Sequence, residues 1–140
     1  MTVQGLDESI AGLDHMRERL THLTPALDDV AEDLKTFIEE RFATRTSPDG
    51  TPWLPVTLNT ELYRHSDGLG LMRSRFATVL YSKVQYGAKA SFAAVHQEGD
   101  RRVPARPFAP TDADQQGPAV ELREHAKESI TYYVRTGQRR

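Results

Sequence analysis

The chain has 140 residues, a formal charge of −2, 38% apolar residues and 27% charged residues, and this length predicts a single domain over residues 1–140 with one hydrophobic core. The near-neutral charge provides no general attraction to nucleic acid or anionic membranes, and the absence of cysteine excludes disulfide bonds and thiolate metal sites. Because no apolar run approaches the roughly 20 residues that span a bilayer, we expect a protein made in the cytoplasm without membrane contact.

The first predicted element is an amphipathic helix close to the N-terminus. Its apolar stripe consists of residues three or four apart: Leu6, Ile10, Leu13, Met16 or Arg17, and Leu20. Such a stripe normally packs against another element. We therefore expect this helix to form half of a core together with the helix that follows it.

A longer helix is predicted from Thr24, which we expect to be the N-cap, with Pro25 at the first helical position, where its missing N–H costs nothing. Its apolar stripe is Leu27, Val30, Ala31, Leu34, Phe37, Ile38 and Phe42. The opposite face is charged and is expected to lie in water: Glu32, Asp33, Lys35, Glu39, Glu40 and Arg41. This is the most clearly patterned element of the sequence.

A turn and the single tryptophan follow the long helix. Ser47-Pro48-Asp49-Gly50 has the residue order of a tight turn, in which Pro48 presets the backbone angle and Gly50 can adopt a positive one. Trp53 has two interpretations. It can be an anchor folded back over the helix end, or an aromatic hot spot in a subunit interface, where tryptophan is enriched.

Residues 57–75 are polar and weakly patterned. Loops of this length are uncommon inside small domains unless they are functional or mobile. We therefore expect an assembly loop that becomes ordered on contact with a partner.

From Phe76 the apolar period changes to two, which predicts a strand to about Tyr86 that bends or splits near Ser82. Leu80, Val84 and Tyr86 should share the side that faces the long helix. One or two strands leave backbone groups unpaired. Further strands must then come from weakly patterned segments or from neighbouring subunits, and the second possibility favours an oligomer.

Residues 92–108 combine a short apolar run, a stop at Gly99 and two prolines. Pro104 and Pro107 hold the residues before them in extended geometry, so Arg106 is expected to be a cation presented to a partner. The simpler interpretation is a surface loop that places Phe108 in the core.

The C-terminal part is predicted as a loosely periodic helix over residues 118–133. A basic tail over residues 134–140 should be flexible in solvent or contact phosphate or an acidic partner. Together these elements predict an α+β fold. Two N-terminal amphipathic helices pack on a small antiparallel sheet, and a helix ends the chain.

No catalytic motif emerges from the sequence. The five histidines are scattered without the spacing of metal ligands, and the best local cluster is His96 with Glu98 and Asp100, which a metal-dependent hydrolase could use. Short polar runs of this kind are common at turns. We therefore expect no catalytic residue, no metal and no cofactor, and a protein that is not an enzyme.

Two blocks of residues resemble a known family. His96-Gln97-Glu98-Gly99 followed by Val103-Pro104-Ala105-Arg106-Pro107-Phe108 is similar to the HQ-x-G and PaRPF signature of the phage virion morphogenesis, or tail-completion, family of tailed bacteriophages. Arg41-Phe42 followed by Pro48-Asp49-Gly50-Thr51-Pro52-Trp53 resembles a second block of that family. Two separated motifs in the right order are more specific than either alone.

The resemblance implies a structural virion protein that completes the tail or joins it to the head as a ring, by analogy a hexamer. Its implied partners are other copies of itself, the tail tube protein and the head-completion or connector protein, while DNA passes through the ring without sequence-specific binding. It would lie at the neck or tail end of the virion. The interface residues we predict are Trp53, His96, Arg101, Arg102, Arg106 and Phe108.

An alternative function from a different class is a nucleic-acid-binding module. Such a module would use Arg101, Arg102, Arg106 and the C-terminal arginines on one face. Its binding would fall steeply as salt rises.

Overall fold

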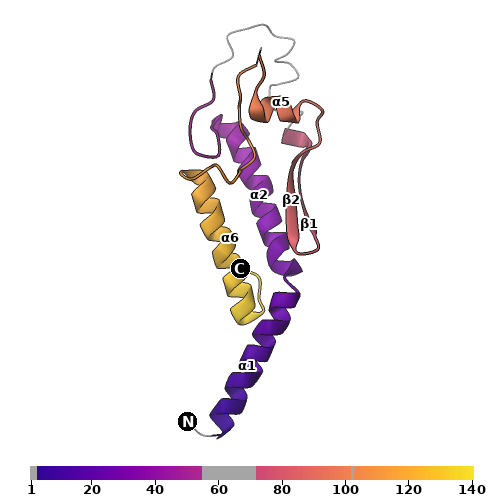
Figure 1. Cartoon of the computed structure of the whole chain (residues 1–140), viewed down its shortest axis with the longest axis vertical. Helices are drawn as coiled ribbons and strands as arrows, with labels where there is room; N and C mark the ends of the chain where they lie inside the picture. Colours follow the sequence, from indigo (N-terminus) through magenta and orange to yellow (C-terminus); the bar gives the residue numbers. More distant parts are fainter. Residues whose placement is uncertain (1–2, 55–71, 102) are drawn as a thin grey trace.

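The computed structural model describes residues 3–54, 72–101 and 103–140 and shows an elongated α+β fold (Figure 1). The elements in chain order are α1 (Val3–Thr21), α2 (Thr24–Thr44), β1 (Arg75–Leu80), β2 (Lys83–Ala88), α5 (Ala93–Glu98) and α6 (Pro118–Thr136). In Figure 1, α2 lies between α6 on one side and the β1–β2 hairpin on the other. None of the helices in the described part of the chain is both long and apolar enough to cross a bilayer.

Helix α2 is the central element of the core, as predicted. It begins at Thr24 itself, with Leu23 as the N-cap and no side-chain cap bond, so the predicted cap was wrong by one residue. It ends at Thr44, and the C-cap residue Arg45 has a left-handed backbone and donates its N–H to the carbonyl of Arg41. Its buried apolar side chains are Ala26, which was not in the predicted stripe, and five residues that were: Leu27, Ala31, Leu34, Phe37 and Ile38.

The strands form one antiparallel hairpin in which Val79 pairs with Val84 and Leu80 with Lys83. The predicted split is confirmed, because Tyr81 and Ser82 form a two-residue turn and Tyr81 has a φ of 57°. Alternation then places Val79 and Val84 on α2, together with the buried Ala77. The prediction that Leu80 also faces α2 was wrong. Leu80 is exposed, because it pairs with Lys83 on the other face of the hairpin.

Helix α1 does not pack on the sheet, which corrects the predicted pair of N-terminal helices. Its apolar stripe is exposed, and in Figure 1 the helix projects from the body of the molecule towards the N-terminus. Its C-terminal turn is attached to α6. The Arg19 guanidinium donates to the carbonyls of Val134 and Arg135 at 3.0 and 2.8 Å, and the Tyr133 hydroxyl donates to the carbonyl of His22 at 3.0 Å. A cation at the end of α6 also suits the helix dipole.

The C-terminal end of the chain is more regular than predicted. Helix α6 runs through residues 134–136, which we had assigned to a flexible tail, and ends at Gly137, whose φ is 73°. Beyond it the Arg139 Nε donates to Asp29 at 2.9 Å, and Arg140 pairs with Glu128 at 2.6 Å. The last arginines therefore contact α2 and α6 of the same chain.

Candidate functional site

The family-like motifs meet at the end of the molecule where α2 finishes and α5 begins. Residues 103–109, here called the Pro-Arg-Pro segment, run alongside α5 and are held by the two side chains that begin the HQ-x-G block. Gln97 uses its whole amide group. Its Oε1 accepts from the backbone N–H of Phe108 and Ala109 at 3.0 and 3.1 Å, and its Nε2 donates to the Ala109 carbonyl at 3.0 Å. The glutamine thus replaces the strand neighbour that an extended segment needs.

His96 holds the same segment from inside the core. Its ring is buried, and its Nδ1 lies 2.7 Å from the carbonyl oxygen of Arg106, so Nδ1 carries the proton and donates. In return the backbone N–H of Arg106 donates to the His96 carbonyl at 2.7 Å. Burial lowers the pKa of His96 from its ordinary value, the hydrogen bond to the Arg106 carbonyl partly opposes this, and the positive charge of Arg106 adds to the lowering. The ring is therefore a neutral structural group.

Gly99 allows the chain to turn from α5 into this segment. Its φ is 74°, and a Cβ placed there would lie 2.6 Å from the backbone nitrogen of Ala105. Asp100 completes the turn by accepting from the Val103 N–H at 2.7 Å. The glycine of HQ-x-G is thus required by backbone conformation and by the close approach of residues 103–105.

The expectation that Arg106 is a presented cation was wrong. Only 6% of the residue is exposed, and its Nε and Nη2 donate to the carbonyl of Leu54 at 3.3 and 3.2 Å. The two prolines fix the backbone as expected. However, the extended segment packs against the protein, so the side chain spans to the segment after Trp53 instead of pointing into solvent.

Four rings form the centre of this region. Trp53 and Phe42 meet edge to face with centroids 5.3 Å apart, while His96 lies 5.3 Å from Trp53 and 5.8 Å from Phe108. The indole N–H of Trp53 donates to the Pro107 carbonyl at 2.9 Å. These contacts agree with the interpretation of Trp53 as an anchor over the end of α2, and Phe108 is buried against Ile38 as the simpler interpretation of residues 92–108 requires.

The Pro48-Asp49-Gly50 turn connects the same region to α6. Ser47 and Thr51 close the turn with a 2.8 Å backbone bond, and the Asp49 carboxylate accepts from the Thr51 N–H at 2.9 Å. Hydrogen bonds from Thr51 lower the pKa of Asp49. Pro48 is fully buried, and its carbonyl accepts from the Ala119 N–H at 2.9 Å. The turn therefore sits on the N-terminal end of α6.

A comparison with family models decides the relationship. The model of the phage virion morphogenesis family matches residues 4–135. The chain belongs to this family. Membership gives the chain a role in building the phage virion. No curated protein and no solved structure matches the chain.

In the structure, several family-motif residues that we predicted to lie at an interface are buried inside one copy of the chain. His96, Arg106 and Phe108 are buried within one copy, and Trp53 is half-buried beside them. Of the predicted interface residues, Arg101 is exposed, and Arg102 lies outside the described residues. The predicted assembly loop also lies mostly outside them. Its described end includes Arg75, whose Nη2 pairs with Glu39 at 2.9 Å.

Sequence reasoning missed two structural roles in this region. Gln97 was noted only as part of a motif, although its place beside His96 and before a proline-rich segment is a signal for a side chain that bonds to backbone. Arg41 was assigned to the wet face of α2, but it is buried with its guanidinium carbon 4.7 Å from the ring centroid of Phe37. The position of Arg41 in the Arg41-Phe42 block was the one sequence feature that could have indicated a structural role.

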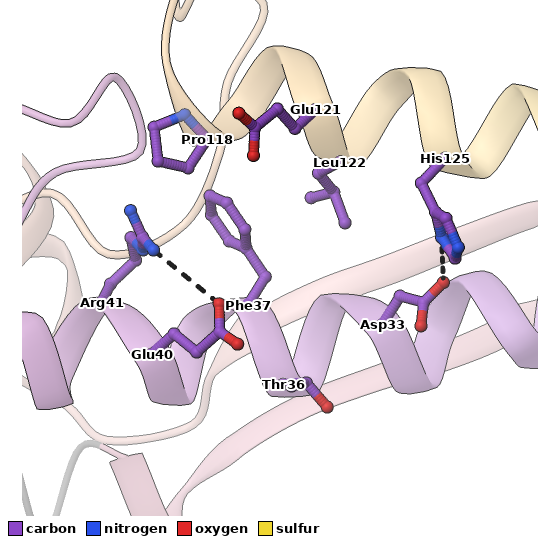
Figure 2. A pocket seen from close by; sticks show the side chains of 9 residues that line it. All are labelled: Asp33, Thr36, Phe37, Glu40, Arg41, Pro118, Glu121, Leu122 and His125. Atoms are coloured by element: carbon purple, nitrogen blue, oxygen red, sulfur yellow. Dashed lines mark hydrogen bonds and ion pairs between the residues drawn. The ribbon is translucent and has the colours of Figure 1, made fainter.

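Arg41 lies at one end of a groove of about 400 Å³ between α2 and α6 (Figure 2). Burial lowers the pKa of Arg41, while Glu40, whose carboxylate is 3.8 Å away, and Glu121 oppose that effect. Further along the groove the Nδ1 of His125 lies 3.0 Å from the Asp33 carboxylate. Acidic side chains dominate the groove, so it would favour a basic group over an anion. In the part of the chain that the structure describes, no three His, Asp or Glu residues are placed to hold a metal ion.

The buried His96 predicts a pH dependence of stability. Its pKa in the folded state is below 6.5, so the unfolded chain binds more protons beneath that pH. The contribution of the neutral His96 to the free energy of unfolding should therefore be fully present above pH 6.5. It should be lost as the pH falls below that value, by about 1.4 kcal/mol for each unit by which the pKa of the folded chain lies below that of the unfolded chain. Urea unfolding between pH 5 and 8 measures this slope. The His96→Gln variant should lose the histidine part of the slope, whereas the exposed His15→Gln variant should keep it. An unchanged slope in His96→Gln would contradict the assignment.

Proposed function

We propose that the chain is a structural subunit that completes the phage tail, or joins it to the head, by assembling as a ring of six copies. The observation that carries the proposal is the family match over residues 4–135. The mechanism is binding and not catalysis. Its partners would be further copies of the chain, the tail tube protein and the head-completion or connector protein, at the neck or tail end of the virion.

Exposed apolar surface and unpaired strand edges in the described part of the single chain support a role in assembly. The motif residues are engaged in holding one copy together, while the apolar stripe of α1 and the tip of the hairpin are exposed. The two strands of the hairpin pair only with each other among the described residues, so both outer edges of this small sheet lack a strand neighbour there. Such features are expected of a subunit that completes its structure in an oligomer. The net charge of −2 suits a ring that DNA passes through without adhering.

The alternative of a nucleic-acid-binding module receives less support. Three of the cations that it needs are engaged within the chain: Arg106 with Leu54, Arg139 with Asp29 and Arg140 with Glu128. Among the described residues of this set, Arg101 is exposed as well, but one further arginine does not make a phosphate-binding face.

Native mass spectrometry of the purified protein, at two concentrations and at low and high salt, tests the proposed ring. We expect a closed assembly with six times the mass of the chain, which persists at high salt because apolar surface holds it together. A chain that stays monomeric at both concentrations would contradict the proposed self-assembly. Retention on DNA that disappears as salt rises would favour the nucleic-acid alternative.

A further inference from the structure

The stripe on α1 is the longest row of exposed large apolar side chains on a single described helix, with Met16 and Arg17 between Leu13 and Leu20. Leu6, Ile10, Leu13 and Leu20 are each between 46% and 65% exposed although they lie on one side of the helix. Single exposed leucines are ordinary, but a row of four along one helix indicates a contact surface. Burying such a side chain is worth about 1.5–3 kcal/mol. The stripe is therefore a strong source of binding energy that the isolated chain does not use.

The outer face of the β1–β2 hairpin is a second unused surface. One face of the hairpin packs on α2, and the other carries Phe76, Thr78 and Leu80, with Tyr81 at the tip. Leu80 is 47% exposed and Tyr81 is 91% exposed. The Phe76 ring lies over Gly87 of the paired strand, so the outer face combines the apolar Phe76 and Leu80 with the polar Thr78, Gln85 and Lys83. Covering this face would remove the exposed side chains of Leu80 and Tyr81 from water, which is favourable.

The two surfaces match in length. From Leu6 to Leu20 the stripe of α1 extends over about 21 Å, at 1.5 Å per residue. From Arg75 to Leu80, β1 extends over about 17 Å, at 3.4 Å per residue. A helix with this stripe can therefore cover the whole hairpin.

They also match in charge. The part of α1 before His15 contains Asp7, Glu8 and Asp14 and no lysine or arginine. The hairpin contains no acidic residue, and its exposed side carries Lys83, with Lys89 just after β2 at 5.9 Å from the Phe76 ring centroid. Two copies of α1 would instead place their acidic residues side by side if they ran parallel. The charges thus favour the hairpin over a parallel pair of α1 helices.

We propose that α1 of one copy packs its apolar stripe on the outer face of the β1–β2 hairpin of the next copy. The proposal rests on the proposed self-assembly and names the contact that produces it. A chain cannot make this contact with its own hairpin while Arg19 and Tyr133 hold α1 at the far end of α6. Because the two surfaces differ, each copy places its α1 on one neighbour and accepts the α1 of the other neighbour on its own hairpin. Such a contact closes into a ring when the rotation between copies allows it.

Disulfide trapping tests this contact directly, because the chain has no cysteine. Leu13 lies at the middle of the stripe and Thr78 near the middle of the outer face, so the two positions meet whichever way the helix runs. One protein would carry Leu13→Cys, and the other Thr78→Cys and an affinity tag. We expect a disulfide-linked dimer of one tagged and one untagged chain in the oxidised mixture, identified by intact mass, and no dimer of comparable yield from either variant alone.

A substitution in the stripe gives a second, independent measurement. Leu13→Asp should weaken association at least about tenfold, because it places a charge in the contact. Circular dichroism should show unchanged helix content, since Leu13 is exposed in the single chain. Tyr132→Asp is the matched control. Tyr132 is also an exposed apolar residue of a helix, but it lies on α6 outside the proposed contact.

The outcomes separate this contact from the proposed ring. A closed ring without the mixed disulfide would overturn the contact and leave the ring in place. The mixed disulfide in open-ended assemblies would support the contact and overturn the ring. A Leu13→Cys dimer that forms alone as readily as the mixed dimer would show that α1 pairs with another α1, and would also overturn the contact.

Discussion

Replacing Phe108 by alanine should lower the free energy of unfolding by about 3–5 kcal/mol. Phe108 is 3% exposed, packs on Ile38, and lies 5.6 Å from Phe42 and 5.8 Å from His96 between ring centroids. Removing the ring loses its burial and leaves a space that Trp53 and His96 cannot fill without leaving their hydrogen bonds. Trp53 contacts this cluster, so urea unfolding followed by its fluorescence measures the effect.

The control is Val95→Ala on α5. Val95 belongs to the same region but is 38% exposed, so its truncation should cost under about 1 kcal/mol. If the loss for Phe108→Ala were as small as for Val95→Ala, Phe108 would not be the core residue described here. The measurement thus distinguishes a residue that supports its own subunit from one reserved for an interface.

Much of the fold could be predicted because it depends on local periodicity. The stripe of α2 and the change to a period of two at Phe76 each fix which side chains share a face, and the structure agrees with both. Leu80 shows the limit of this reasoning. A two-residue turn at Tyr81 and Ser82 restarts the alternation, so one strand's pattern cannot be extended across it.

The motifs located the candidate site in the sequence, but they could not predict which of its side chains point into the protein. The prolines beside Arg106 establish an extended backbone and say nothing about what lies next to it. The acceptor is the carbonyl of Leu54, which is 52 residues away in the chain. Arg41 likewise lines a groove whose other wall is the distant helix α6. Single-sequence patterns carry no information on such contacts.

For α1, the sequence predicted the apolar face but not the surface that covers it. Its stripe was correctly located, but the expected partner within the chain was wrong, because periodicity shows only that a face will be covered. If motif residues such as His96 and Gln97 build the subunit, then assembly must use other surfaces. The exposed stripe of α1 is a surface of that kind.

Replacing Gly117 by alanine is the second change for which we expect a large loss, of about 2–4 kcal/mol. Gly117 has φ 67° and ψ −150°, a conformation that side chains with a Cβ rarely adopt. An added Cβ would also lie 2.3 Å from the carbonyl oxygen of Asp49. The atom that it would meet belongs to backbone, so the Pro48-Asp49-Gly50 turn would have to move away from the start of α6, and the bond from the Ala119 N–H to Pro48 would be strained or lost.

Gly12→Ala provides the control for the Gly117 substitution. Gly12 is helical, and nothing lies within 4 Å of the position where its Cβ would be placed. Alanine there should stabilise α1 by up to about 1 kcal/mol, because it favours the helix more than glycine does. Thermal and urea unfolding of both variants should therefore shift in opposite directions. Equal and small shifts would mean that the turn at Pro48 does not rest on the start of α6 in solution, and that the motif at residues 48–53 stabilises the subunit by other contacts.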